Sequence, residues 1–200
     1  MAPERSPRDH SAPRPVVLVP IKDFRQAKNR LATRLGPDER QSLARDMATR
    51  VVAAAHGHDV RVVCNDEEVA EWAQAHGASV AWVEASGLNP AITEAVARLE
   101  PDIEQVLIAH ADLPHATTLE GIAVPGRVTI VPDRHRDGTN VMSIPVGVGF
   151  EFHYGPGSLH AHVAEGLARG LDVELRQIAE LQWDVDTPHD LDDRIGEAPA

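Results

Sequence analysis

Cysteine, basic residues and long apolar runs are all scarce in this chain of 200 residues. Cys64 is the single cysteine, which excludes an internal disulfide and a zinc site built from cysteines. No stretch approaches the roughly 20 apolar residues that cross a membrane as a helix, and the polar, proline-rich start has no apolar signal region. We therefore expect a cytoplasmic protein that makes no membrane contact.

Acidic residues outnumber basic ones by 31 to 19, which leaves a formal net charge of −12. Nucleic-acid binding needs basic surface to replace the counterions of the phosphates, so this balance argues against a nucleic-acid partner. The basic residues are unevenly placed, since five of them fall between positions 22 and 34: Lys22, Arg25, Lys28, Arg30 and Arg34. Local positive charge in an acidic protein favours a specific anionic ligand.

The chain is predicted to form one folded domain at 14–195. An apolar content of 42% over 200 residues is enough for one good core. Pro, Arg, Ser and Asp are frequent in residues 1–13, which are predicted to be a disordered arm, and residues 196–200 are predicted to be a flexible tail.

Predicted strands and helices alternate along the first half of this domain. Strands are expected at 16–20, 60–64, 79–83 and 105–109, and helices at 37–56, 67–76 and 89–99. Right-handed crossovers turn such a series into a parallel sheet with helices on both faces. A smaller β-containing part follows, with strands at 128–132, 141–145 and 171–175 and helices at 158–169 and 188–195. The predicted class is α/β with a mostly parallel central sheet.

Three carboxylates come from two distant places in the sequence. Asp112 comes soon after the apolar run 106–109, which reads as a buried parallel strand whose carboxyl end carries the acid to the ligand-binding edge of the sheet. Asp184 and Asp186 are two positions apart, so they share a face of an extended segment. Three clustered carboxylates repel one another unless a hard cation lies between them. The trio therefore predicts Mg²⁺ and phosphate chemistry.

Part of this pattern has a purely structural explanation. Thr187 can cap a helix that begins at Pro188, with Asp190 as an acid of the first turn. That explanation leaves Asp184 without a role.

The basic loop after the first predicted strand lies where doubly wound folds bind phosphates. Lys28 can place a point charge on a triphosphate, and Arg30 or Arg34 can donate two parallel hydrogen bonds to phosphate oxygens. A solvated basic loop with no ligand is the alternative.

Three further segments have both a structural and a functional reading. In Gly87-Leu88-Asn89-Pro90 the glycine lets a nucleotide approach the backbone and Asn89 can reach a base or ribose, although Asn89 as a helix cap explains the same residues. Segment 133–140 has an Asp-Gly turn signal that fits a plain hairpin and a ligand loop equally well. In 154–158 two glycines free the backbone, and Ser158 caps a helix that either binds an anion or is simply capped.

Taken in order, these segments resemble the CofC/FbiD family, guanylyltransferases of coenzyme F-420 biosynthesis, over residues 15–193. The resemblance rests on Val-Pro-Ile-Lys (19–22), Ala-Lys-Asn-Arg-Leu (27–31), Gly-Leu-Asn (87–89), Ala-Asp-Leu-Pro (111–114), Asp-Arg (133–134), Gly-Thr-Asn (138–140), Tyr-Gly-Pro-Gly-Ser (154–158) and Asp-Val-Asp-Thr-Pro (184–188). It implies a single-domain MobA-like, Rossmann-like nucleotidyltransferase fold. It also implies transfer of GMP from GTP to phosphoenolpyruvate, 2-phospho-L-lactate or 3-phospho-D-glycerate, with release of pyrophosphate.

The resemblance also implies roles for individual residues. Those expected to hold the phosphoacid are Thr139, Gly155 and Ser158, and those expected to hold Mg²⁺ are Asp112, Asp184 and Asp186. Lys28 and Asp112 would be catalytic. The residues expected to bind the nucleotide are Lys22, Lys28, Arg30, Gly87, Leu88 and Asn89. The first loop of MobA-like proteins is usually glycine-rich, whereas this loop has no glycine before Gly36, so basic side chains are expected to replace some backbone donors.

GTP is thus the expected co-substrate and Mg²⁺ the expected cofactor, and the downstream transferase that receives the guanylylated product is a candidate partner. Two alternatives stay open. One is a MobA-like enzyme with another phosphate acceptor, and the other is a non-catalytic nucleotide-binding regulator.

Overall fold

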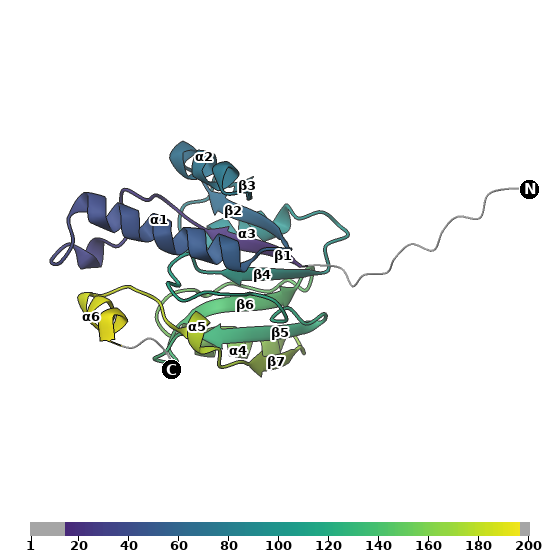
Figure 1. Ribbon diagram of the computed structural model, residues 1–200. Helices are drawn as coiled ribbons and strands as arrows, with labels where there is room; N and C mark the ends of the chain where they lie inside the picture. The colour runs from purple at the N-terminus through teal and green to yellow at the C-terminus, as the bar shows by residue number, and fades with distance from the viewer. Residues whose placement is uncertain (1–14, 197–200) are drawn as a thin grey trace, which may run out of the picture.

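One mixed sheet of seven strands organises the computed structural model, which describes residues 15–196. The strands lie in the order β3-β2-β1-β4-β6-β5-β7, from top to bottom in Figure 1. Their bounds are β1 Val16–Pro20, β2 Asp59–Cys64, β3 Ser79–Trp82, β4 Gln105–Ala109, β5 Arg127–Pro132, β6 Thr139–Pro145 and β7 Asp172–Leu175. All the predicted strands are confirmed, and those of the second half extend the same sheet. The predicted arm at 1–13, and the predicted tail beyond residue 196, lie outside the described residues.

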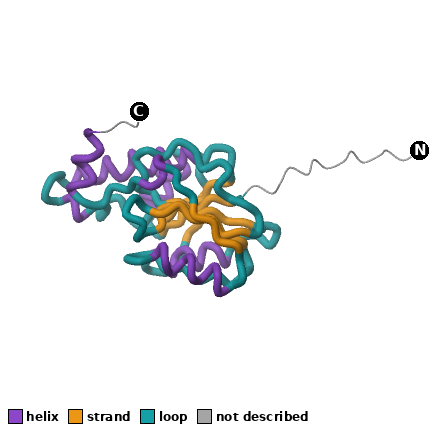
Figure 2. The backbone as a smooth tube through the Cα atoms, turned by 90° about the horizontal axis from the view of Figure 1, so that it is seen from below, coloured by secondary structure: helices purple, strands orange, loops and turns teal. Residues whose placement is uncertain are grey.

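Helices cover both faces of the sheet, as predicted (Figure 2). The longer helices are α1 Pro37–Ala54, α2 Glu67–Ala75, α3 Leu88–Ala97, α4 Ser158–Ala168 and α6 Pro188–Gly196. Val17 and Val19 of β1 face α1 and α2, whereas Val16 and Leu18 face α3 and α4. Because both faces of β1 are buried, its sequence is a continuous apolar run rather than an alternating one. No helix within the described residues is long and apolar enough to span a membrane.

β6 is the one strand of the described sheet that runs against its neighbours, pairing antiparallel with both β4 and β5. Its first residues therefore lie at the edge where β1 and β4 end. Val141 is paired with Ala109, the last residue of β4, and the His110 N–H donates to the Asn140 carbonyl at 3.0 Å. This single reversal brings Thr139 to the carboxyl end of the parallel strands.

Two helix starts differ from the prediction. Gly87 with φ 95° is the N-cap of α3, and Gly157 with φ 73° is the N-cap of α4. Asn89 and Ser158 were each predicted as the cap, and both assignments are wrong. A glycine tolerates the positive φ at these two corners, and neither helix start has a side-chain cap. Asn89 is the second residue of α3, and Ser158 is the first residue of α4, with 2% of its surface exposed.

Two short helices were not predicted, namely η1 Asn29–Leu31 and α5 Ala179–Gln182. Neither is long enough to show a helical repeat of apolar residues. Both matter for the site, because η1 follows Lys28 directly and α5 ends two residues before Asp184.

Candidate active site

An ion cluster joins three predicted site residues across the chain. The Lys28 ammonium nitrogen lies 2.5 Å from Oδ2 of Asp112 and 2.9 Å from Oδ1 of Asp186. The Lys28 side chain is only 10% exposed, so these contacts are shielded from water. The sequence pattern placed one of these acids at the end of a strand and the other near the C-terminus, and the structure brings both to one cation.

Local packing explains how these side chains meet. Lys28 has a left-handed backbone, with φ 54° and ψ 37°, and turns the loop into η1. Leu31 of η1 packs with Met47 of α1 and Val185 in a small buried cluster. Val185 is fully buried, so the two acids that flank it, Asp184 and Asp186, lie at the edge of this cluster rather than inside it, and Asp186 reaches Lys28.

Burial and charge act in opposite directions on the members of the cluster. Burial alone would lower the pKa of Lys28, but the carboxylates of Asp112 and Asp186 raise it above its ordinary value. Burial would raise the pKa of Asp112, and Lys28 and His110 hold it below its usual range. Burial and then the charges of Asp112 and Asp186 raise the pKa of Asp184 to about 6, although hydrogen bonds from its own backbone and from Asn140 act in the opposite direction. Asp184 is therefore the member of the trio whose pKa is raised.

The donor chemistry of the trio suits Mg²⁺, which prefers carboxylate oxygens. Oδ1 of Asp112 is buried and has no hydrogen-bond partner, and it is thus available as a ligand. The three acids are not, however, arranged as a finished metal cage: no group of three or more His, Cys, Asp or Glu side chains within residues 15–196 has that geometry. In the structure the Lys28 ammonium supplies the positive charge between Asp112 and Asp186.

The other basic residues of the loop divide into two sets. Arg25 pairs with Asp23 and Asp66, and both terminal nitrogens of Arg34 bind the carboxylate of Asp192. Arg34 thus already donates two bonds to a carboxylate of this chain, and its predicted availability for a phosphate is not supported. Lys22 and Arg30 point to solvent, with Arg30 78% exposed and 3.6 Å from Asp186.

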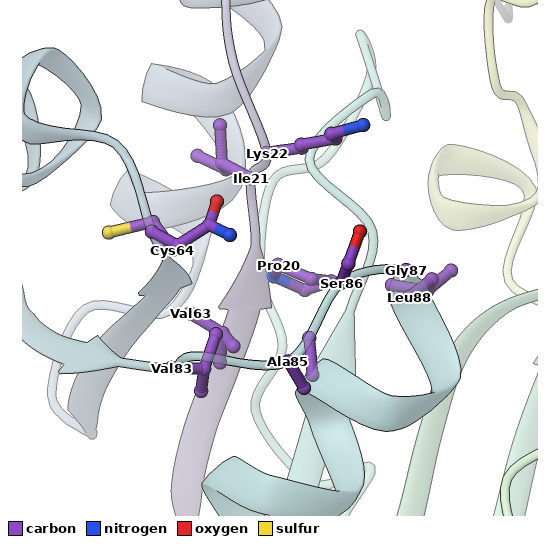
Figure 3. A pocket seen from close by; sticks show the side chains of 12 residues that line it. Pro20, Ile21, Lys22, Val63, Cys64, Val83, Ala85, Ser86, Gly87 and Leu88 are labelled. Carbon is purple, nitrogen blue, oxygen red and sulfur yellow. The ribbon is translucent and has the colours of Figure 1, made fainter.

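Two adjoining pockets open at this edge of the sheet. The larger, about 550 Å³, is bounded by the basic loop, α1 and the ion cluster, and His110 lines it as well. The smaller, about 210 Å³, lies between the ends of β1, β2 and β3 and the start of α3. In Figure 3 the apolar side chains of Val63 and Val83 lie at one end of the smaller pocket and Lys22 at the other. Lys22 and Leu88 line both pockets, which are therefore neighbours.

Asn65 and Ser86 also line the smaller pocket, and the sequence reasoning missed both. A signal was present, because Asn65 directly follows the end of β2 and Ser86 directly precedes Gly87. Polar residues at the carboxyl ends of parallel strands face the ligand edge of such folds.

The three predicted acceptor residues, Thr139, Gly155 and Ser158, come from the start of β6 and the start of α4, which are joined by the hydrogen bond between Thr139 and His162. The Ser158 N–H donates to the Gly155 carbonyl at 3.1 Å, and the Gly157 N–H donates to Oδ2 of Asp137 at 3.0 Å. Segment 133–138 is thus the hairpin turn between β5 and β6, and it also packs on the glycine segment.

His162, one turn into α4, orients the hydroxyl of Thr139. Nε2 of His162 accepts the His153 N–H at 2.9 Å, so the proton of the neutral ring is on Nδ1. Nδ1 then donates to Oγ1 of Thr139 at 3.0 Å, which leaves the Thr139 O–H free to donate elsewhere. Burial, with His153 and His110 nearby, lowers the pKa of His162 to about 4 and keeps the ring neutral. The sequence reasoning assigned His162 no specific role.

Asn89 does not line either pocket. Its amide nitrogen donates to the Tyr154 carbonyl at 3.1 Å, and its amide oxygen accepts the Tyr154 N–H at 2.7 Å. The predicted contact between this amide and a base or ribose therefore lacks support, because both polar atoms of the side chain already have partners.

Known proteins match this chain over nearly its whole length. The family model described as guanylyl transferase, CofC like, matches residues 15–196. The phosphoenolpyruvate guanylyltransferase of Sphaerobacter thermophilus is 34% identical over 197 residues, which cover 92% of this chain and 94% of the relative. The 2-phospho-L-lactate guanylyltransferase of Methanothermobacter thermautotrophicus is 31% identical, covering 89% and 82%. Among solved structures, a nucleotidyl transferase from Methanothermobacter thermautotrophicus superposes with a TM-score of 0.61 at 14% identity, covering 91% and 95%.

Proposed function

This chain belongs to the family of CofC-like guanylyl transferases, and from that membership we propose that it transfers GMP from GTP to phosphoenolpyruvate in coenzyme F-420 biosynthesis. The family makes it a nucleotidyltransferase, and the choice among three-carbon phosphoacids is the proposed part. Relatives named for phosphoenolpyruvate are similar to this chain over most of its length, which supports that acid. The observation that carries the assignment of the site is the Lys28 ammonium held between Asp112 and Asp186 beside two adjoining pockets.

The chemistry needs positioning and charge more than proton transfer. A phosphate oxygen of the acceptor attacks the α-phosphorus of GTP, a new phosphate–phosphate linkage forms, and the bond to the β-phosphate breaks to release pyrophosphate. The attacking oxygen is already ionised at neutral pH, so no general base is required. Lys28 neutralises charge on the triphosphate, and its burial makes that interaction stronger than it would be in water.

We assign Mg²⁺ binding to the carboxylates of Asp112, Asp184 and Asp186. Bound Mg²⁺ would supply the positive charge that lets two anionic substrates approach each other. The unpartnered Oδ1 of Asp112, and the raised pKa of Asp184 near the charges of Asp112 and Asp186, support this assignment. Lys28 also has a second role, because it neutralises the charges of Asp112 and Asp186 when no nucleotide is bound.

The nucleotide is assigned to the two pockets. The smaller pocket is lined mainly by apolar side chains, together with the polar side chains of Lys22, Asn65 and Ser86, which suits a purine ring with a hydrogen-bonding edge. Gly87 and Leu88 would pack beside the base, with Asn65 and Ser86 as candidate readers of guanine. The triphosphate would extend into the larger pocket toward Lys22, Lys28 and Arg30.

The acceptor is assigned to the neighbouring segment of Thr139, Gly155 and Ser158. Thr139 has an O–H oriented by His162, and Gly155 has a φ of 132° that leaves its backbone open to a close approach. Hydroxyl and backbone donors suit a small acid that bears a carboxylate and a phosphate.

Release of pyrophosphate from GTP, measured with each of the three phosphoacids and with none, tests the proposal. We expect release with phosphoenolpyruvate, slower release with the other two acids, and none with GTP alone. Release only with an unrelated phosphate acceptor would favour the alternative of another MobA-like transferase. GTP binding without release under any of these conditions would favour a regulator. The downstream transferase that receives the product remains the proposed protein partner.

A further inference from the structure

Asn89 forms a clamp between two segments that lie 65 positions apart in the sequence. Its amide group makes two hydrogen bonds with the backbone of one residue, Tyr154, at 2.7 and 3.1 Å. A backbone N–H can only donate and a carbonyl can only accept, so these two bonds fix the orientation of the amide. The pair resembles one rung of a sheet, made by a side chain instead of a strand.

The two ends of this clamp belong to different parts of the proposed site. Asn89 directly follows Gly87 and Leu88, which line the smaller pocket, where the nucleotide is assigned. Tyr154 directly precedes Gly155 in the segment that leads into α4, where the acceptor is assigned. The Tyr154 ring packs on His110 and His162, with ring centroids 5.1 and 4.7 Å apart, so a shift of the Tyr154 backbone also disturbs the surroundings of Thr139.

Two simpler roles for Asn89 do not agree with the structure. A helix cap is not needed, because Gly87 is the N-cap of α3 and the Asn89 side chain makes no cap bond. A direct reader of the base would have its amide at a pocket wall, whereas Asn89 lines neither pocket. Both polar atoms of the Asn89 side chain are bonded instead to Tyr154, in the segment assigned to the acceptor.

We propose that Asn89 is a positioning residue that couples the nucleotide and acceptor subsites by fixing the Tyr154 backbone to the start of α3. The inference rests on the proposed function, because it uses the assignment of the two subsites. Nucleotide packed against Gly87 and Leu88 restrains the start of α3, and through Asn89 it restrains the segment 153–158. Binding of GTP and of the phosphoacid is then mutually favourable, since coupling between two sites is reciprocal.

The test replaces Asn89 with alanine and uses Thr93→Val as a matched control. Thr93 lies one turn further along α3, where its hydroxyl donates to the Asn89 carbonyl at 2.9 Å, so the control also removes a hydrogen bond from this helix. For Asn89→Ala we expect the KM for phosphoenolpyruvate to rise about tenfold while the Kd for GTP changes less than about threefold. Thr93→Val should leave both constants close to wild type. The ratio of GTP to ATP specificity should also stay unchanged in Asn89→Ala.

A second measurement uses the wild-type protein and does not depend on the stability of a variant. Amide hydrogen exchange of peptides that cover 153–158 should slow when GTP alone is added, because the clamp transmits the restraint. Two results together would overturn the coupling role while leaving the proposed function intact. The active wild-type enzyme would show no such protection, and Asn89→Ala would lose the preference for GTP over ATP. A wild-type protein that releases no pyrophosphate with any phosphoacid would instead overturn the proposed function itself.

Discussion

The proposed nucleotide side and the proposed acceptor side of the molecule differ in how they would bind negative charge. On the proposed nucleotide side, the segment after the parallel strand β1 carries Lys22, Lys28 and Arg30, and Lys28 forms ion pairs with Asp112 and Asp186. On the acceptor side, the reversed strand β6 and helix α4 bury neutral groups, with Thr139 and Ser158 each 2% exposed. Two anionic substrates can thus be held side by side without placing all the positive charge in one location.

The two sides differ in strand direction as well as in charge. A parallel strand followed by a crossover leaves a long loop at its carboxyl end, and long basic side chains can reach out from such a loop. An antiparallel strand brings its first residues to the same edge, so Thr139 lies there with its backbone already paired with β5. The two halves are therefore expected to respond differently to mutation and to pH, and the following predictions use that difference.

The largest effect is expected on the charged side. Asp112→Asn should lower kcat/KM by at least about 10³-fold, because it removes a charge from the proposed site. The fold should stay intact, because no packing interaction in the core requires that charge. The matched control is Asp192→Asn, which breaks the ion pair with Arg34 away from the pockets and should retain activity. Near-normal turnover of Asp112→Asn at saturating Mg²⁺ would refute the metal assignment.

Base selection is the next largest effect. GTP should be preferred over ATP by more than about 100-fold in kcat/KM, because polar groups placed for guanine lose their partners when adenine binds. Ser86→Ala and Asn65→Ala should each reduce this preference by about tenfold. The measurement is kcat/KM for GTP and for ATP with each variant. An equal decrease for the two nucleotides would show that neither side chain reads the base.

Smaller, selective effects are expected on the neutral side. Ser158→Ala and Thr139→Val should each raise the KM for the phosphoacid about tenfold and the KM for GTP much less, since each removes a hydroxyl near one anion. Steady-state kinetics with each substrate varied in turn provide the measurement. If both KM values rise by the same factor, the segment of Gly155 and Ser158 is structural only.

The last expected effect concerns stability in acid rather than activity. The pKa of His162 is about 4 in the folded protein, below its ordinary value of 6.5, so the folded state keeps this ring neutral while the unfolded state takes up a proton below pH 6.5. The stabilising contribution is therefore complete above pH 6.5 and decreases as the pH falls toward 4, by at most about 3 kcal/mol.

Urea denaturation of wild type, His162→Gln and His160→Gln between pH 7 and pH 4 isolates this contribution. His160 is exposed on the same helix and serves as the control. The wild type and His160→Gln should lose more unfolding free energy on acidification than His162→Gln does. Identical pH profiles for all three proteins would contradict the buried neutral state of His162.

Much of the charged side was predictable from sequence, because its features are local. A continuous apolar run such as 106–109 indicates a strand buried on both faces, and an acid just after it must lie at the ligand edge. The same reasoning placed Lys28 in the loop after β1. It could not detect that Arg34 binds Asp192, because that pairing depends on where α6 packs.

The neutral side was less predictable, because its features depend on contacts between distant segments. Asn89 follows a glycine and precedes a proline, which is also the pattern of a helix cap, and only the position of Tyr154 shows its real partner. His162 is similarly one of 11 histidines, with no spacing that distinguishes it. The pairing of β6 with β4 was also not evident, because a hairpin turn indicates that β6 runs against β5 and does not fix which other strand it joins.

Titration calorimetry of two variants with two ligands tests most directly whether the charged side binds the nucleotide and the neutral side binds the acid. Lys28→Ala should weaken GTP binding by more than about tenfold and change the affinity for phosphoenolpyruvate, measured without nucleotide, by less than about threefold. Thr139→Val should do the reverse. If either variant weakens both ligands to the same extent, the two substrates share one site and the division between the two sides is wrong.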